Sequence, residues 1–249
     1  IHVEAGLRSF DWTMPEEINR ILTDRMSELL FVSEKSGVDN LRNEGVHDSK
    51  IHFVGNVMAD TLLTHIGKAK KSDVLARLGL TPHGYGVVTL HRPGNVDNPK
   101  KLEAIFRAFE VITRKTTLVF PVHPRTRKNI ENSEFIGRVI ALENLKMTEP
   151  FGYLDFLCLM NSAAVVITDS GGIQEETTIL GIPCMTLREN TERPVTITHG
   201  TNRLVPVTDS GIIRHFRCAI SSGAGKSLKT PELWDGKASD RIAAIIEKY

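Results

Sequence analysis

The chain has 249 residues, which is long enough for one or two domains of ordinary size. Its hydrophobic fraction of 41% and charged fraction of 24% are typical of globular proteins and argue against a disordered, collagen-like or coiled-coil chain. Lys and Arg number 31 against 30 Asp and Glu, so the net charge of +1 gives no electrostatic reason to expect nucleic acid or an anionic membrane as partner. An anionic ligand therefore has to be bound by local groups.

Cysteine usage and apolar runs narrow the class further. Cys158, Cys184 and Cys218 stand far apart without a CxxC pair, which argues against a disulfide framework and against a zinc ribbon. No uninterrupted apolar run approaches the ~20 residues of a membrane-spanning helix, and no charged-then-apolar leader opens the chain. We therefore expect a protein of the reducing cytoplasm. Because the sequence starts without Met in a strand-like segment at residues 1–3, we also expect it to be part of something longer.

Short β-branched runs alternate with helical patterns along the chain, as in βα units on a parallel sheet. An early helix is indicated by an apolar stripe at Ile18, Ile21, Leu22, Met26 and Leu29. The expected strands are residues 30–33, 51–55, 86–91, 117–123, 145–148, 164–169, 183–187 and 204–207.

A second helix is indicated by apolar residues at helical spacing after the strand at 86–91. Asn98 is its expected N-cap and Pro99 its first helical residue. The stripe consists of Leu102, Ile105, Phe106, Phe109 and Ile112. From about Gly55 to residue 207 the pattern predicts a doubly wound α/β domain, in which ligands bind beyond the carboxyl ends of the strands.

The loop after the strand at 164–169 has the most distinctive motif. Ser170, Gly171 and Gly172 lie between an apolar strand and a helix start, where glycines let a ligand approach closely and the free amides of the helix favour phosphate. Glu175 or Glu176 can accept from sugar hydroxyls, as acidic residues do in dinucleotide sites. The alternative is that the glycines form only a tight turn and the glutamates only favour the helix dipole. A serine-protease nucleophile is disfavoured because a helical pattern follows.

Two further strands end in histidine beside arginine. His91 and Arg92 follow one strand, and His123 with Arg125 repeats the arrangement one unit later. An imidazole there can transfer protons near neutral pH, and a guanidinium can bind a diphosphate with two hydrogen bonds. The alternative is a histidine that is hydrogen-bonded to a backbone carbonyl.

Acidic residues near the start of the chain are candidates for acid/base chemistry. Glu4 follows the strand-like segment and is a candidate general base. Glu16 lies three residues after Thr13, a spacing that fits a capping box, so a structural role is available to it. A charged loop with Arg188, Glu192 and Arg193 follows the strand at 183–187, and its alternative is a solvated loop. No metal-binding motif and no G-x-G-x-x-G fingerprint is present.

Taken together, these motifs resemble those of the non-hydrolysing UDP-N-acetylglucosamine 2-epimerases, over residues 1 to about 205. The matching motifs are HVEAGLR at 2–8, PEE-x-NR at 15–20, GN at 55–56, HRP at 91–93, PVH at 121–123, TDSGGIQEE at 168–176 and TERP at 191–194. The resemblance implies the two-domain glycosyltransferase-B architecture, of which this chain would hold the second half, a doubly wound Rossmann-like α/β domain.

That architecture implies three parts of the chain. Residues 1–54 would be a remnant of the N-terminal Rossmann-like domain, residues 55–230 the UDP-binding domain, and residues 231–249 a closing helix. The first domain, with the family's catalytic aspartate, has no counterpart here. Gly94 departs from the family, where many relatives have Glu.

The resemblance also implies a reaction: inversion of C2 of UDP-N-acetylglucosamine, giving UDP-N-acetylmannosamine, by elimination and re-addition of UDP. Glu4, Glu16 and His91 would be catalytic, no cofactor or metal is required, and a role in cell-envelope polysaccharide synthesis is expected. The residues expected to bind UDP are Ser170, Gly171, Gly172, Glu176, Arg193, Phe151, His123 and Arg92.

Two other classes remain open. One is a module that binds UDP or a UDP-sugar without turnover, because an acid/base residue and half of the cleft are absent. The other is a glycosyltransferase of the same architecture, for which the sequence shows no acceptor site. A UDP-sugar is the expected partner, a homodimer is expected from the family, and nucleic acid and membrane are not expected.

Overall fold

A computed structural model describes residues 1–222 and 230–249, which form two compact units. The first unit contains Ile1–His65, Asn190–Gly200 and residues 230–249, and the second contains Ile66–Glu189 and residues 201–222. The division falls inside a helix, α3 (Val57–Ala69), and assigns the C-terminal helix α13 (Ala238–Ile246) to the first unit. The domain boundaries expected after residues 54 and 230 stay predictions.

The second unit is built on a six-stranded parallel sheet with the order β6-β5-β4-β7-β8-β9. In chain order this is 3-2-1-4-5-6, the doubly wound arrangement, so the winding direction reverses between β4 and β7. The loops that follow these two neighbouring strands therefore open at the crevice where such folds bind ligands. The strands are β4 (Tyr85–Thr89), β5 (Thr117–Pro121), β6 (Leu145–Thr148), β7 (Val165–Thr168), β8 (Cys184–Thr186) and β9 (Asn202–Leu204).

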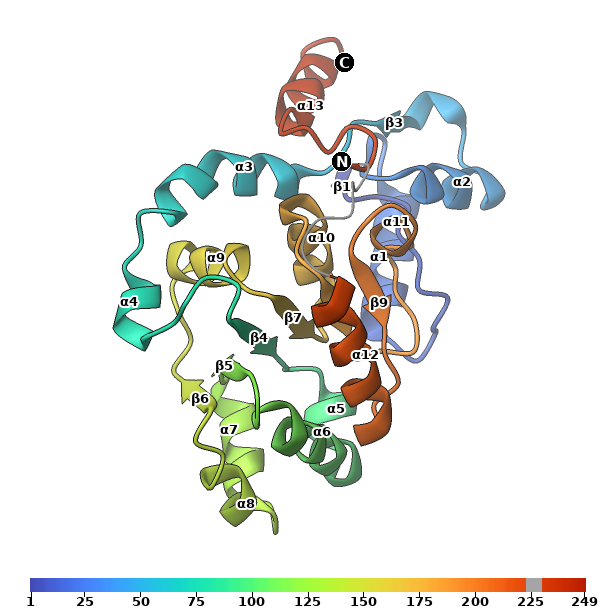
Figure 1. Cartoon of the computed structure of the whole chain (residues 1–249). Helices are drawn as coiled ribbons and strands as arrows, with labels where there is room; N and C mark the ends of the chain where they lie inside the picture. The colour runs from blue at the N-terminus through green and yellow to red at the C-terminus, as the bar shows by residue number, and fades with distance from the viewer. Residues whose placement is uncertain (223–229) are drawn as a thin grey trace. The chain divides into compact units, whose positions relative to one another are not determined.

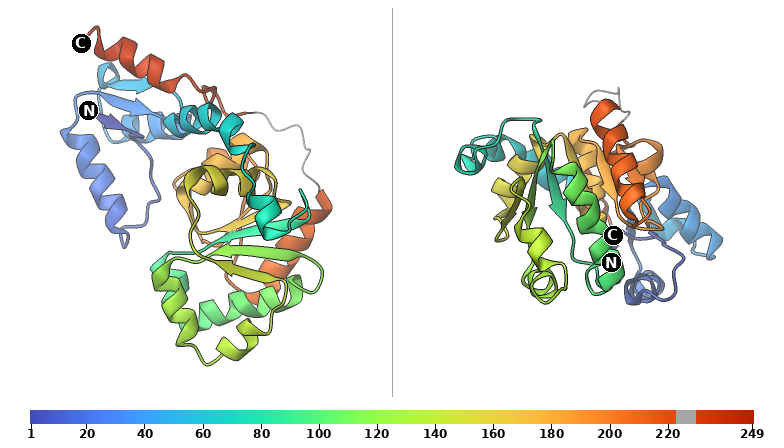
Figure 2. Two further views of the ribbon diagram at one scale, coloured as in Figure 1. Left: turned by 90° about the vertical axis from the view of Figure 1, so that its left-hand side faces the viewer. Right: turned by 60° about the horizontal axis from the view of Figure 1, so that its bottom comes forward.

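Helices cover both faces of this sheet. On one face α6 (Pro99–Ile112) packs against α12 (Asp209–Ser222), and on the other lie α9 (Tyr153–Asn161) and α10 (Gly171–Leu180) (Figures 1 and 2). The shorter helices of this unit are α4 (Val74–Leu78), α5 (Pro93–Val96), α7 (Pro124–Glu131) and α8 (Ile136–Ile140).

The apolar stripe and the cap expected for α6 are confirmed. All five stripe residues are buried in the main core, beside side chains from β4, β5 and β7. The Asn98 side chain accepts hydrogen bonds from the backbone amides of Lys100 and Lys101, and Pro99 is the first helical residue. The helix therefore begins where the sequence places it, because its first amides receive an acceptor.

The first unit contains a three-stranded parallel sheet with the order β1-β2-β3. The C-terminal segment packs closely on it: the Trp234 indole donates to the Ser33 carbonyl over 2.9 Å, and a Cβ on Gly55 would lie 2.0 Å from the Leu233 carbonyl oxygen. Its elements are β1 (His2–Val3), α1 (Pro15–Met26), β2 (Leu30–Val32), α2 (Lys35–Asn43), a 3-10 turn (Asp48–Lys50), β3 (Ile51–Phe53) and α11 (Val195–Thr198), together with α13.

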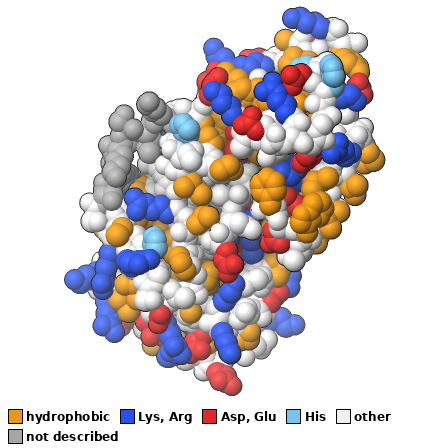
Figure 3. Space-filling view, turned by 90° about the vertical axis from the view of Figure 1, so that its right-hand side faces the viewer, with side chains coloured by type: hydrophobic (Ala, Val, Ile, Leu, Met, Phe, Trp, Pro, Cys, Tyr) orange, Lys and Arg blue, Asp and Glu red, His pale blue; other side chains and the backbone are white. Residues whose placement is uncertain are grey.

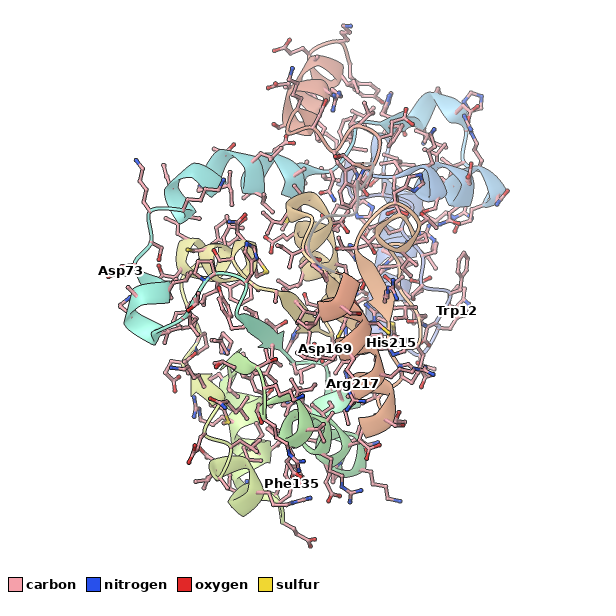
Figure 4. The ribbon with its side chains drawn as sticks, viewed as in Figure 1. Trp12, Asp73, Phe135, Asp169, His215 and Arg217 are labelled. Atoms are coloured by element: carbon pink, nitrogen blue, oxygen red, sulfur yellow. The ribbon has the colours of Figure 1, made fainter. Side chains whose placement is uncertain are left out.

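Four of the five residues expected on the early helical stripe lie on α1, and three of these are exposed, whereas Leu29 lies beyond the helix and is buried. Ile18, Leu22 and Met26 are 42%, 54% and 82% exposed, whereas the buried residues of the helix are Glu17 and Asp24. Figure 3 shows hydrophobic side chains gathered on the surface that faces the viewer, and Trp12, labelled in Figure 4, is also exposed. The helix turns its acidic side inward because these two carboxylates accept hydrogen bonds from the loop before it.

The capping box expected at Thr13 and Glu16 is wrong. The N-cap of α1 is Met14, which provides no side-chain cap, and Pro15 is the first helical residue. The Thr13 hydroxyl donates instead to Asp11 Oδ1 over 2.6 Å. Pro15 has no backbone N–H that would need a capping acceptor, so the first turn of α1 begins without the expected capping box.

Strand limits differ from the expected ones mainly at their carboxyl ends. Most observed strands end one or two residues earlier, because residues such as His91 and His123 have already left the sheet for the loops. The strand expected at residues 204–207 is wrong in position, since β9 covers Asn202–Leu204. Pro206 follows it and has no amide to donate to a neighbouring strand.

We expect Asn98→Ala to lower the free energy of unfolding of the second unit by about 1 kcal/mol, because two amides of α6 lose their acceptor. Urea unfolding followed by circular dichroism measures this change. Asn132→Ala, an exposed position at the end of α7, is the matched control and should change it by less than about 0.5 kcal/mol. Equal effects of the two variants would contradict the capping role.

Candidate functional site

The N-terminus of α10 has the features of an anion site. Ser170 is its N-cap, and Gly171 and Gly172 are the first helical residues, directly beyond β7. The Ser170 hydroxyl makes no capping hydrogen bond, and the first amides of a helix have no partner within it. Apart from its chain neighbours and the backbone of its own helix, a Cβ on Gly172 would meet no atom of the described residues within 4 Å, so packing against these residues does not require glycine there. Glycine at this position instead leaves room for a ligand against the positive end of the helix.

The loop after β4 is held to this turn by Asp169, which is labelled in Figure 4 and whose residue surface is fully buried. Its carboxylate accepts from the backbone amides of His91 and Arg92 over 3.1 and 3.0 Å and from the side-chain amide of Asn95 over 3.2 Å. The Arg92 guanidinium Nε donates to the Asp169 carbonyl over 2.9 Å. The structure therefore brings His91 and Arg92 to the start of α10.

The Asp169 carboxyl is ionised despite its burial. Burial raises the pKa of this carboxyl. The hydrogen bond and the charge of His91, with the donors from Arg92 and Asn95, lower the pKa by more than burial raises it, so the net shift is downward. The His91 Nδ1 lies 3.1 Å from Asp169 Oδ1, and the rest of the His91 side chain is about half exposed.

His123 has a different setting at the end of the neighbouring strand β5. It is the N-cap of α7, and its Nδ1 accepts from the backbone amide of Arg125 over 3.3 Å. Because β4 and β5 are adjacent and parallel, His91 and His123 lie at the same edge of the sheet.

Glu176 lies one and a half turns into α10 and is 4% exposed. Tyr153, the first residue of α9, donates its hydroxyl to Glu176 Oε1 over 3.2 Å. Burial raises the pKa of Glu176, although the Tyr153 hydrogen bond opposes that shift. Phe151 is half-buried in the loop before α9, and Glu175, the alternative to Glu176, is also buried.

The first unit holds the remaining candidate residues. Glu4 follows β1 with a positive φ of 66°, and its Oε2 lies 3.5 Å from Nη2 of Arg193. Arg193 also forms an ion pair over 2.6 Å with Glu192, which is buried. The charged loop of residues 188–193 therefore brings Arg193 next to Glu4.

Two carboxylates of α1 hold the loop that contains Glu4. Asp24 accepts from Gly6 N over 3.1 Å, forms an ion pair with Arg8 Nη2 over 2.7 Å, and its Oδ1 lies 2.6 Å from His2 Nδ1. Burial raises the pKa of Asp24, but the hydrogen bonds from His2 and Arg8 outweigh it, so the pKa lies below its ordinary value. Glu17 accepts from the amides of the residues at 9 and 10.

Glu16 has no comparable setting. It is exposed on the first turn of α1, and its backbone carbonyl accepts from Arg20 Nε over 3.2 Å. The expected site residues are thus divided between the units: Glu4, Glu16 and Arg193 in the first, the others in the second. Their roles stay predictions.

The sequence patterns predict no role for Asp169, Asp24, Glu17 or Tyr153. The available signal for Asp169 was its place directly after a strand that neighbours the one ending at His91. Within residues 1–222 and 230–249, no group of three or more His, Cys, Asp and Glu residues could hold a metal ion. In the same residues, every helix is too short or too polar to cross a bilayer.

The fold and site define a Rossmann-like α/β protein with a helix terminus suited to an anion. The family model for UDP-N-acetylglucosamine 2-epimerase matches residues 1–247. The chain belongs to this family, which is a family of isomerases, and the doubly wound fold class expected from sequence is confirmed.

Individual relatives agree with this assignment. A UDP-N-acetylglucosamine 2-epimerase from Methanocaldococcus jannaschii is 39% identical, covering 98% of this chain and 68% of its own. A UDP-2,3-diacetamido-2,3-dideoxy-D-glucuronate 2-epimerase from Pseudomonas aeruginosa is 40% identical, covering 99% and 67%. The crystal structure of the M. jannaschii enzyme in complex with UDP-GlcNAc and UDP superposes with a TM-score of 0.90 over 100% of this chain and 68% of that one, at 39% identity. The chain thus spans about two thirds of the length of these relatives.

We expect Asp24→Asn to destabilise the first unit by about 3 kcal/mol at neutral pH, because buried Arg8 loses an ionised partner. Since folding lowers the pKa of Asp24, its stabilisation is complete above the unfolded value of 3.8 and is lost as the pH falls through the lower folded value. The difference between wild type and variant should therefore shrink at acid pH.

Urea unfolding between neutral pH and about pH 3 measures this difference. Asp39→Asn, an exposed change of the same charge on α2, is the control and should have little effect at any pH. A constant difference between wild type and Asp24→Asn over the whole range would contradict the assigned ion pair.

We expect Gly172→Ala to weaken UDP binding at least about tenfold without lowering stability, because the new methyl group occupies open space at the start of α10. Calorimetry with UDP and thermal unfolding measure the two quantities. Gly137→Ala on α8, where a Cβ also meets nothing within 4 Å, is the matched control and should leave UDP affinity unchanged. Unaltered binding by Gly172→Ala would rule out close approach of the ligand to this turn.

Proposed function

We propose that the protein containing this chain interconverts UDP-N-acetylglucosamine and UDP-N-acetylmannosamine by inverting C2 of the sugar. The observation that carries the proposal is the open N-terminus of α10, which lies at the point where the winding of the sheet reverses. The M. jannaschii relative, crystallised with UDP-GlcNAc and UDP, supports the choice of substrate.

Direct deprotonation of C2 is unfavourable because no carbonyl group adjoins that carbon. Elimination avoids this difficulty: a base takes the C2 proton, the C1–O bond breaks, and its electron pair leaves with UDP. The product pair is UDP and 2-acetamidoglucal. Re-addition reverses each step, with the proton delivered to the opposite face of C2, so two acid/base groups are needed.

Each residue of the site has a proposed part in this sequence. Glu4 and Glu16 exchange the C2 protons, with an aspartate outside this chain. His91 donates to the departing diphosphate. The groups proposed to stabilise its charge are the Ser170 hydroxyl, the amides of Gly171 and Gly172, Arg92, His123 and Arg193. Glu176 accepts from the ribose, and Phe151 contacts uracil.

Incubation of the chain with UDP-N-acetylglucosamine in D₂O tests the reaction. Formation of UDP-N-acetylmannosamine with deuterium at C2, followed by NMR, supports elimination and re-addition. Parallel incubation with the diacetamido-glucuronate substrate that names the P. aeruginosa relative tests the choice of sugar. UDP binding without product favours the binding module, and transfer of sugar to an acceptor favours a glycosyltransferase.

We expect Glu176→Gln to raise the dissociation constant of UDP about tenfold or more, because a hydrogen bond to a charged acceptor contributes about 1.5–3 kcal/mol. Removal of the ribose hydroxyls should have a smaller effect in this variant than in wild type, which calorimetry with UDP and its deoxy analogues measures. Glu189→Gln, an exposed change in the loop after β8, is the control. Equal discrimination by Glu176→Gln and wild type would remove Glu176 from the ribose site.

A further inference from the structure

Asp169 occupies a position from which it can act on His91 across the sheet. Thr168 is paired with Thr89 in the β7–β4 register, and the Asp169 amide donates to the Thr89 carbonyl over 3.2 Å. The Asp169 side chain therefore lies against the residues that follow β4. This is the point where the winding of the sheet reverses.

The contacts of the Asp169 carboxylate indicate which nitrogen of His91 carries a proton. An ionised carboxylate only accepts, and this one accepts from the amides of His91 and Arg92 and from the side chain of Asn95. His91 Nδ1 forms an ion-pair contact with Asp169 Oδ1 at 3.1 Å, and because the carboxylate only accepts, a hydrogen bond between these two atoms requires the proton on Nδ1. In the neutral ring this leaves Nε2 with its lone pair.

The second histidine at this edge has the opposite arrangement. His123 Nδ1 accepts from the Arg125 amide, so Nδ1 has the lone pair and Nε2 carries the proton. A proton on Nδ1 would remove this cap from α7. His123 can therefore donate a hydrogen bond through Nε2 but cannot give that proton away without becoming an imidazolate.

We propose that Asp169 is the positioning residue that holds His91 in the Nδ1–H tautomer, which makes His91, and not His123, the proton donor to the departing diphosphate. The assignment of the diphosphate as the acceptor depends on the proposed function. His91 starts as the imidazolium, and its Nε2 proton passes to a phosphate oxygen of UDP as the C1–O bond breaks. The ring is left in the Nδ1–H form that Asp169 already binds, and on re-addition the proton returns to Nε2.

Long-range ¹H–¹⁵N NMR of the histidine-labelled chain at mildly alkaline pH tests the tautomers. Wild type should show His91 protonated on Nδ1 and His123 protonated on Nε2, with the two spin systems assigned from His91→Gln and His123→Gln. In Asp169→Asn, His91 should change to the Nε2–H form, while His123 stays as it is. An Nε2–H form of His91 in wild type, or no change in Asp169→Asn, would overturn the proposal.

A control variant and the wild-type spectrum alone complete the test of the tautomers. Asn95→Ala removes a neutral donor to Asp169 but leaves the contact with His91, so the tautomer of His91 should not change. If Asp169→Asn does not fold, the wild-type spectrum alone still shows whether the two histidines differ as stated.

The outcomes for Asp169 and for the epimerase reaction are separable. If the tautomers are as expected but no UDP binds, the proposed function fails while the positioning role stands. If the chain turns over, Asp169→Asn should lower kcat by about 100-fold, as removal of an acid/base group does, with KM nearly unchanged. A loss confined to KM would contradict a role in proton transfer.

Discussion

The buried carboxylate of Asp169 is the constraint on which the second unit's site depends. A buried charge is tolerated only when donors surround it, and in the described part of the chain the hydrogen bonds to this carboxylate come from the loop after β4 and from Asn95 of the short helix α5. The loop is therefore bound to the end of β7, from which α10 begins. The positions of a histidine, an arginine and a helix terminus are thus coupled through one side chain.

In the first unit, other buried carboxylates fix a loop in the same way. Asp24 and Glu17 of α1 accept hydrogen bonds from backbone amides of residues 2–10, and Asp24 also pairs with the guanidinium of Arg8. The same segment holds Glu4 in a left-handed backbone conformation that few residues other than glycine adopt. In both units, acidic side chains that exchange no proton with the substrate in the proposed chemistry determine where the reacting groups lie.

Much of the fold was predictable because it depends on local patterns. The stripe and the Asn98 cap of α6 require only helical periodicity, and the alternation of strands and helices predicts a doubly wound sheet whose loops carry the motifs. The face that α1 buries was not predictable, because periodicity shows that a helix is amphipathic but not what covers each side. Met26, a member of the expected apolar stripe, is exposed for this reason, and Asp24 of the same helix is buried.

The site was predictable as a set of motifs and not as a set of roles. His91 and His123 have equivalent places in the sequence, each after a strand and beside an arginine. Their difference arises from partners 78 residues away in one case and two residues away in the other. Only the folded chain brings the distant carboxylate to one of them.

The path of the chain through the units affects how the protein can be assembled. The chain leaves the second unit after β8, contributes Asn190–Gly200 to the first, and returns to form β9. The bond from Trp234 to Ser33 spans 201 residues of sequence. During synthesis from the N-terminus, β1, β2 and β3 emerge long before the segments that complete their unit. Nascent chains must therefore keep this small parallel sheet from aggregating until residues 190–200 and 230–249 have been synthesised, since such distant contacts close late and slowly.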